Sequence, residues 1–366
     1  MHEFNQRAQT IEQIILDLGQ LIVPWAREQR LDKPIYRIIQ RYAARLGEDA
    51  ELWQDQFGEL LLLYHTLNHP NRISMILKAE KDGDFPRPFT GDELQMLNNL
   101  LHYQSLICRF YTLQDEMHPD IYHVSEAVSG HDYVVVSPQL RQAVEGNRTL
   151  ILSVLIPVGI SPPPADHPLD APWEDVPGFT PLGQFAAFGT YTENDVEFFG
   201  NALAGRSLSR SQFGPFIGEH LPECIFLSGL ATPTADHPAM AQRLYLADFT
   251  VPEPGIDIAP LEDQFEVQRR GDWSYGRATL ALQEAQDADK EAPHTMEFFY
   301  HKKNRHTIIR AVDHDAFLTL IQLLGVQSLA VPPQIDASMG MISAVQLLMD
   351  KPFPGDYIAK EFDSEF

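Results

Sequence analysis

Eight prolines lie between residues 157 and 181, including the run Pro162-Pro163-Pro164. Proline fixes its φ angle and has no backbone N–H to donate, so this density excludes a helix interior and a central strand. The sequence therefore predicts a long extended loop over residues 157–181. Loops of this length in compact domains are usually lids, binding loops or linkers. Trp173 and Phe179 indicate that part of the loop packs on the protein.

The first 118 residues carry apolar side chains at three- and four-residue spacing, the period of an amphipathic helix. The stripes begin near Ile11, Ile35, Leu52, Ile73 and Leu94. The last stripe follows Thr90-Gly-Asp-Glu93, which matches a capping box, and we predict that its helix runs to Tyr111. We expect residues 1–118 to form a helical bundle domain of four or five helices.

Beyond residue 118 the pattern changes to short apolar runs bounded by turn residues, as in strands. The predicted strands cover residues 133–136, 150–156, 224–227, 243–249, 265–268, 277–283, 296–300 and 307–312. The last two form a hairpin within residues 294–312, and helices near 314–324 and 341–349 follow. Because strands adjacent in sequence can pair directly, we expect a mixed domain with a largely antiparallel sheet over residues 119–366. The predicted fold class of the whole chain is α+β.

The chain is strongly acidic, with a formal net charge of −24 at pH 7. Residues 149–268 hold sixteen acidic side chains and only three basic ones, whereas residues 290–310 hold five Lys or Arg, three His and two Glu. A surface of this sign repels phosphate, so nucleic acid is an unfavourable partner. The charge favours basic partners or cations, or else it serves only solubility.

Cysteine content and hydropathy predict a cytoplasmic protein with no membrane association. Cys108 and Cys224 are too few for a secreted disulfide framework. Residues 1–20 lack the apolar core of a secretory signal. The longest apolar run, residues 150–160, is about half the length of a membrane-spanning helix.

Three Asp-His pairs provide carboxylate and imidazole groups that suit a transition metal or acid–base chemistry. They are Asp166-His167, Asp236-His237 and Asp313-His314. Two of them lie in Ala-Asp-His-Pro after a predicted strand, which indicates either a degenerate duplication or chance. The competing interpretation is structural, because Asp before a turn caps backbone amides and Asp313 precedes a predicted helix.

His65 and His69 lie four residues apart on one predicted helix and could share a zinc ion. The metalloprotease motif places Glu after the first His, but this chain has Thr66 there. We therefore expect core or capping roles for both histidines. The chain also lacks a Gly-x-Ser-x-Gly elbow around Ser228 and a phosphate-binding loop.

Five basic or titratable side chains crowd the turn of the predicted hairpin, where like charges repel one another. They are His301, Lys302, Lys303, Arg305 and His306. Either the acidic segments supply carboxylates nearby, or the turn contacts an anion or the acidic face of another protein. The C-terminal tail alternates acids with aromatic residues that could dock on the protein itself or on a partner, namely Tyr357, Phe362 and Phe366.

Together these features predict a non-enzymatic protein-binding factor, such as an adaptor, inhibitor, immunity factor or assembly factor. It would act through its electrostatically polarised surface, with the hairpin turn as the contact and with no cofactor. The alternative from another class is a metal-dependent hydrolase or related enzyme that uses the Asp-His pairs. A small-anion sensor at the hairpin is a third hypothesis.

Overall fold

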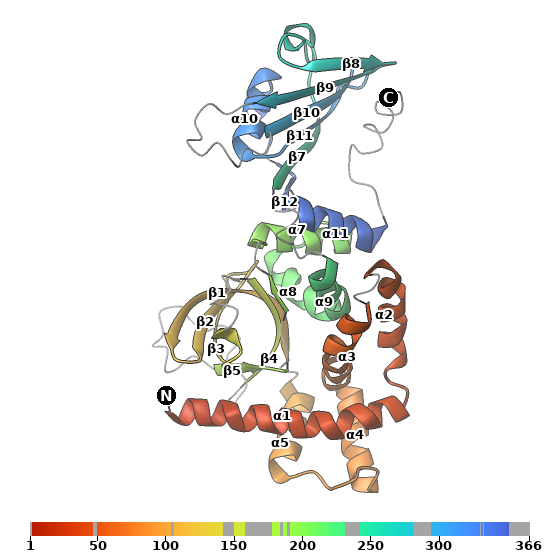
Figure 1. The fold of residues 1–366 in the computed structure, drawn as a ribbon, viewed down its shortest axis with the longest axis vertical. Coiled ribbons are helices and arrows are strands. Elements are labelled where there is room, and N and C mark those ends of the chain that lie inside the picture. The colour runs from red at the N-terminus through yellow and green to blue at the C-terminus, as the bar shows by residue number, and fades with distance from the viewer. Residues whose placement is uncertain are drawn as a thin grey trace. The chain divides into compact units, whose positions relative to one another are not determined.

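The computed structural model describes residues 2–46, 50–103, 106–141, 150–157, 178–183, 186–188, 191–230, 242–280, 294–329, 331 and 333–350 (Figure 1). It divides into two compact units, Met1–Val196 with Ala204–Thr232, and Glu197–Leu203 with Pro233–Phe366. A helical N-terminal region precedes sheet-rich segments, which confirms the α+β character. The boundary predicted after residue 118 falls at the end of a strand that pairs with the next strand.

The helices of the N-terminal region follow the apolar stripes of the sequence. They are α1 His2–Glu28, α2 Lys33–Leu46, α3 Ala50–Leu67, α4 Pro70–Asp82 and α5 Gly91–Tyr103. The capping box at the start of α5 is confirmed, because Thr90 N donates to Glu93 Oε2 at 2.6 Å and Glu93 N donates to Thr90 Oγ1 at 3.2 Å. Within the described residues, no helix is both long and apolar enough to cross a membrane.

The prediction that the fifth helix continues to Tyr111 is wrong, because β1 occupies Ile107–His118. Tyr111 packs inside a barrel with Ile107 and Leu113, so the apolar positions follow a period of two. Cys108 and Phe110 are buried on the opposite side of the strand. A segment buried on both faces shows no alternation of apolar and polar residues, and this made its period ambiguous in the sequence.

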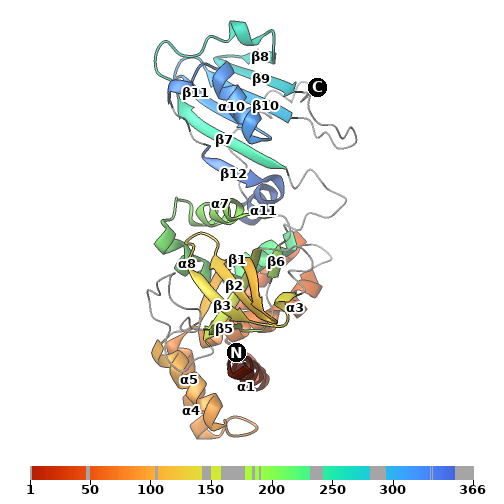
Figure 2. The same cartoon turned by 90° about the vertical axis from the view of Figure 1, so that its left-hand side faces the viewer.

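Five strands of the first unit close into a barrel, which Figure 1 shows end-on and Figure 2 from another side. These are β1, β2 Ile121–Glu126, β3 Asp132–Val136, β4 Leu150–Pro157 and β5 Gly178–Pro181, and β6 Ala186–Phe188 adds to β4. The order is β1-β2-β3-β5-β4, β4 pairs back to β1, and only β3 and β5 are parallel among the pairs of this sheet. This is the connectivity of an OB-type barrel.

Both ends of the predicted proline-rich loop are strands, which corrects the loop boundaries of 157–181. Pro157 ends β4, and Phe179 in β5 is 1% exposed in the barrel interior. Strand β5 has only four residues, so it donates few hydrogen bonds to its neighbouring strands. Pro181 lies at its end, where the missing backbone N–H is tolerated. Residues 158–177 lie outside the described residues.

The helices that follow the barrel are α7 Glu193–Ala204, α8 Arg210–Glu219 and α9 Leu221–Leu230. The predicted strand at residues 224–227 is therefore wrong. These four residues are all buried. In a sequence, a fully buried helical segment can be told from a buried strand mainly by its length. A strand precedes one Ala-Asp-His-Pro and a helix precedes the other, so the match of elements that suggested a duplication is lost.

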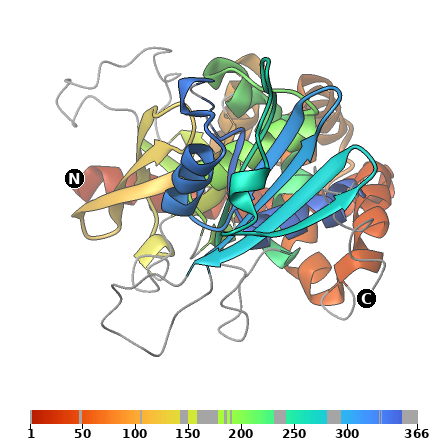
Figure 3. The same ribbon diagram turned by 90° about the horizontal axis from the view of Figure 1, so that it is seen from above.

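The second unit contains a six-stranded sheet; its antiparallel pairing agrees with the prediction, but its strand at residues 335–338 was not predicted. Its strands are β7 Arg243–Thr250, β8 Glu266–Arg270, β9 Trp273–Leu280, β10 His294–His301, β11 His306–Ala311 and β12 Ile335–Ser338, in the order β12-β7-β11-β10-β9-β8. Helix α10, His314–Leu323, packs on one face through Phe317 and Leu320 (Figures 1 and 3). Helix α11, Met339–Met349, follows β12 and contributes Ile342 to the core on the other face.

Candidate functional site

The basic hairpin turn joins β10 to β11, and acidic side chains of the same unit compensate much of its charge. Lys303 Nζ lies 2.7 Å from Asp272 Oδ2, and Arg305 Nη1 lies 2.8 Å from Glu253 Oε1. The hydrogen bond between Lys303 and Asp272 raises the pKa of the lysine and lowers the pKa of the aspartate. This geometry matches the intramolecular interpretation of the turn.

The two histidines of the turn enclose an aromatic ring. The Trp273 ring centroid lies 4.8 Å from that of His301 and 5.8 Å from that of His306, both at steep interplanar angles. His306 Nε2 also lies 2.6 Å from Asp248 Oδ1. Lys302 is exposed, and its backbone N–H donates to Asp272 O at 2.8 Å. The proposed contact of this turn with a partner stays a prediction.

Only one of the three Asp-His pairs, Asp313-His314, lies within the described residues. Asp313 Oδ1 accepts a 2.7 Å hydrogen bond from Ala316 N and caps α10, while the His314 ring packs 5.4 Å from Tyr245. Across the described ranges, no group of three or more His, Cys, Asp or Glu could hold a metal ion. The other residues predicted for sites lie outside those ranges, namely Asp166, His167, Asp236, His237, Tyr357, Phe362 and Phe366.

Part of the outer surface of the barrel is exposed to solvent. The helices that pack on the barrel set the limits of this exposed part. Ile121, Val134 and Val136 form a buried cluster with Ala8 of α1. Helix α8 packs on β1. The last five residues of β1, 114–118, are exposed although they still pair with β2. The uncovered surface therefore combines the end of β1 with the adjoining parts of β2 and β3.

A hydrogen-bonded row of polar side chains crosses this uncovered surface. His123 Nδ1 lies 3.1 Å from Asp115 Oδ1, and His123 Nε2 lies 3.0 Å from Asp132 Oδ1. Ser125 Oγ donates to the same Asp132 oxygen at 2.5 Å. The Nδ1 contact is a hydrogen bond when that nitrogen carries the proton, and the Nε2 contact lies at ion-pair distance. We call Asp115, His123, Ser125 and Asp132 the barrel-face row.

Most charged side chains around the barrel-face row are acidic. Between Arg109 and Arg141 the chain has five acidic residues and no Lys or Arg. Arg141 itself is held by Asp120 at 2.8 Å. Sequence reasoning missed this surface because it followed the larger acidic stretch over residues 149–268. The signal that reveals it is the absence of Lys and Arg from residues 110–140.

A buried ion pair stands at the end of the barrel against α8. Arg109 Nε lies 3.4 Å from Glu126 Oε1, and the glutamate side chain is only 6% exposed. A Cβ atom on Gly214 of α8 would lie 2.1 Å from Arg109 Nε. The helix therefore packs directly on the pair, and this end of the barrel is closed to a ligand.

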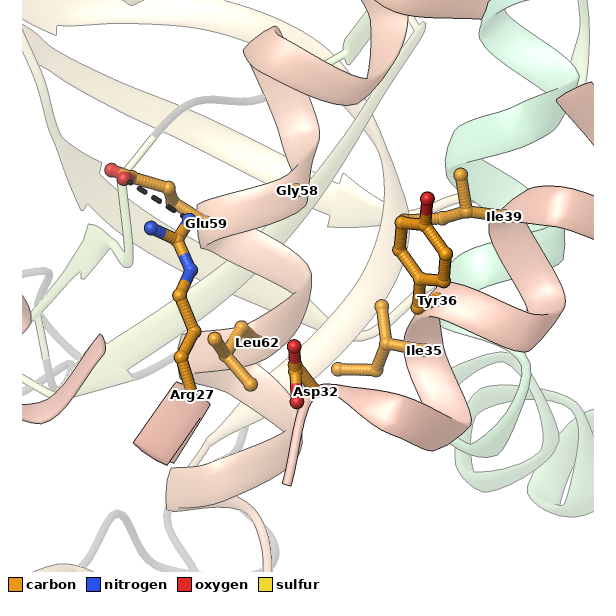
Figure 4. Close-up of a pocket in the computed structure, with 8 residues that line it drawn as sticks. All are labelled: Arg27, Asp32, Ile35, Tyr36, Ile39, Gly58, Glu59 and Leu62. Carbon is orange, nitrogen blue, oxygen red and sulfur yellow. Dashed lines mark ion pairs between the residues drawn. The ribbon is translucent and has the colours of Figure 1, made fainter. Parts of the chain in front are cut away.

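A groove of about 330 Å³ lies among the end of α1, α2 and α3 (Figure 4). Arg27 Nη2 lies 3.6 Å from Glu59 Oε1 on one wall, and both side chains are more than half exposed. Tyr36 on the opposite wall is 47% exposed. The groove is open and carries a solvated ion pair, so its charges have little directing effect.

Comparison with known proteins gives no relative for this chain: no family model, no curated protein and no solved structure matches it.

Proposed function

We propose that this chain is a non-catalytic binding protein whose barrel face receives a Lys- or Arg-rich segment of another protein. The observation that carries the proposal is the barrel-face row, in which Asp115 and Asp132 flank His123 on the uncovered strands. OB-type barrels bind ligands on strands 2 and 3 and their neighbouring loops. Such a likeness in fold is only an analogy, so the charge of the face must decide the ligand.

Electrostatics favours a cationic protein segment over nucleic acid. The face lies in a stretch without Lys or Arg, in a chain of net charge −24. A nucleic acid would bring phosphates to these carboxylates, whereas Lys and Arg side chains complement them. Cys108 and Cys224 are buried free thiols, and burial raises the pKa of Cys108 to about 12. Inert thiols suit the cytoplasmic setting that we include in the proposal.

The basic hairpin remains a second predicted contact, and the structure favours it less. Asp248, Glu253 and Asp272 already lie against His306, Arg305 and Lys303. A partner's anionic groups would have to compete with these carboxylates for the basic side chains of the turn.

The test is a binding titration with oligolysine and with a single-stranded oligonucleotide, each at low and at high salt. The double variant Asp115→Asn/Asp132→Asn should weaken oligolysine binding by about 3- to 10-fold, which corresponds to the loss of two surface charge contacts. The control Asp82→Asn/Asp84→Asn removes the same charge from exposed positions elsewhere and should bind as the wild type does. Equal weakening in both variants, or preferential binding of the oligonucleotide, would refute the proposal.

A further inference from the structure

A second pocket, of about 270 Å³, lies among α2, α3, the start of α4 and the junction of α8 and α9. All of these elements belong to the first unit. Ile35, Ile38 and Leu61 contribute apolar side chains to its lining, and His65, Asn68 and Arg72 contribute polar groups. An apolar cavity with a few convergent polar groups is the usual form of a small-molecule site.

Arg72 is the first sign that this pocket takes an anion. Its Nη1 donates to His65 O at 2.5 Å, and within the part of the chain that the structure describes no carboxylate lies within 4.0 Å of its guanidinium. Burial lowers the pKa of Arg72. Other half-buried arginines, Arg243 and Arg310, do have carboxylate partners. A half-buried cation without a counter-ion is unusual in so acidic a chain.

His65 is the second sign. Its Nε2 is buried and has no hydrogen-bond partner. Burial lowers the pKa of His65 to about 4, and the positive charges of Arg72 and His69 add to this effect. The imidazole is therefore neutral near pH 7, and its Nε2 is an unsatisfied polar atom buried behind the pocket lining.

The N-terminus of α4 adds to the positive charge of Arg72. His69 is the N-cap of this 13-residue helix and makes no side-chain cap hydrogen bond. Pro70 at the first helical position has no N–H, and Arg72 N and Ile73 N already donate to His69 O, so only the helix dipole and the N–H of Asn71 favour a negative charge at that position. Nearby, Tyr64 Oη donates to Gly218 O at 2.8 Å and accepts from Asn68 Nδ2 at 3.0 Å, so this hydroxyl is fully occupied.

We propose that this pocket binds a small organic monoanion, with its carboxylate at Arg72 and its apolar body against Ile35, Ile38 and Leu61. The volume is below that of a drug-sized site, which limits the body to a short branched chain or a single ring. Glu219 lines the same pocket and is exposed, so its carboxylate disfavours a second negative charge on the ligand. Phosphate dianions and dicarboxylates therefore bind less well than monocarboxylates.

The first experiment uses acetate, isovalerate and benzoate as probes. Benzamide serves as the neutral counterpart of benzoate, and phosphate and succinate serve as dianions. Binding is measured by thermal stabilisation and by calorimetry. Isovalerate or benzoate should bind the full chain at least about tenfold more tightly than benzamide, phosphate or succinate. Failure of all three carboxylates to bind up to about 10 mM would overturn the proposal, as would equal binding of benzamide and benzoate.

Variants locate the site. Arg72→Gln should weaken carboxylate binding by about tenfold or more, whereas Arg37→Gln removes the same charge from an exposed position of α2 and should change nothing. Arg72→Lys keeps the charge and should retain part of the affinity. Because Glu219 is exposed, Glu219→Gln should fold normally and strengthen succinate binding more than benzoate binding. The assignment would be contradicted if Arg72→Gln bound carboxylates as tightly as the wild type, or if Glu219→Gln left the affinity for succinate unchanged.

Discussion

At the scale of single residues, the end of the barrel depends on the missing side chain of Gly214. A Cβ atom there would lie 2.1 Å from Arg109 Nε and 2.6 Å from Glu126 Oε1, so the buried pair would have to separate or α8 would have to move. We expect Gly214→Ala to lower the free energy of unfolding of this unit by about 1–3 kcal/mol, as overpacking does. Denaturant titration measures the change.

The matched control for that substitution is Gly91→Ala in α5. An added Cβ at Gly91 meets no atom within 4 Å. We expect its free energy of unfolding to stay within about 0.5 kcal/mol of the wild-type value. A Gly214→Ala protein as stable as this control would show that α8 does not press on the Arg109–Glu126 pair.

The lowered pKa of His65 makes the free energy of unfolding depend on pH, and it fixes the sign of that dependence. Its pKa is about 4 in the folded protein and 6.5 for the ordinary side chain, so between these values the unfolded chain binds more protons. Stability from the neutral imidazole is therefore present above pH 6.5 and is lost as the pH falls towards 4. After allowance for partial exposure, we expect a loss of about 1–2 kcal/mol.

The measurement compares unfolding free energies of the wild type and His65→Gln across this pH range. Glutamine does not titrate, so the wild-type curve should fall more steeply on acidification than the variant curve. Parallel curves would mean that His65 titrates normally in the folded protein.

At the scale of secondary-structure elements, α10 begins where Asp313 accepts a hydrogen bond from Ala316 N. Loss of such an N-cap costs about 1 kcal/mol. Asp313→Ala should therefore lower the midpoint of unfolding of the second unit, whereas Asp315→Ala, exposed in the first turn of the same helix, should have a smaller effect. If Asp315→Ala lowers the midpoint of thermal unfolding more than Asp313→Ala does, Asp313 is not the main cap of α10.

Most elements recovered from the sequence have one-sided burial; the exception is β4, which is buried along most of its length and was predicted as a strand over residues 150–156. Helices α1 to α5 each present an apolar stripe, and the β10–β11 hairpin is defined by a polar turn between apolar runs. Residues 107–111 and 224–227 are buried on more than one side, so neither segment shows a period and both were assigned to the wrong element. Polarity patterns alone cannot separate such segments.

The barrel could not be predicted because its closure joins distant segments. The β1–β4 pair brings Cys108 opposite Val154, and β3 meets β5 through Val135 and Phe179. No local pattern encodes these pairs, and β5 is short and lies among prolines. The acidic barrel face could have been found from the absence of Lys and Arg in residues 110–140. The Arg72 pocket could not, because a missing counter-ion is a property of the three-dimensional arrangement.

At the scale of the whole molecule, the two units have separate hydrophobic cores. Tyr111, Val135 and Phe179 belong to the barrel core, and Phe298, Ile309 and Phe317 belong to the core between α10 and the sheet. Each core holds a glycine against which another side chain or ion pair packs. Gly214 has this role in the first unit, and Gly276 has it in the second, where an added Cβ would lie 2.1 Å from Phe298 Cε1.

Each substitution disturbs the packing of only one unit. The two glycine variants together therefore test whether the units unfold independently. We expect calorimetry of the full chain to resolve two transitions. Gly214→Ala should lower the temperature of one, and Gly276→Ala the other, by several degrees for about 1–3 kcal/mol. A ligand of the Arg72 pocket should raise only the transition that Gly214→Ala lowers. If either substitution lowers one common transition instead, the units unfold as a single cooperative block, and binding at the first unit would then stabilise the sheet of the second as well.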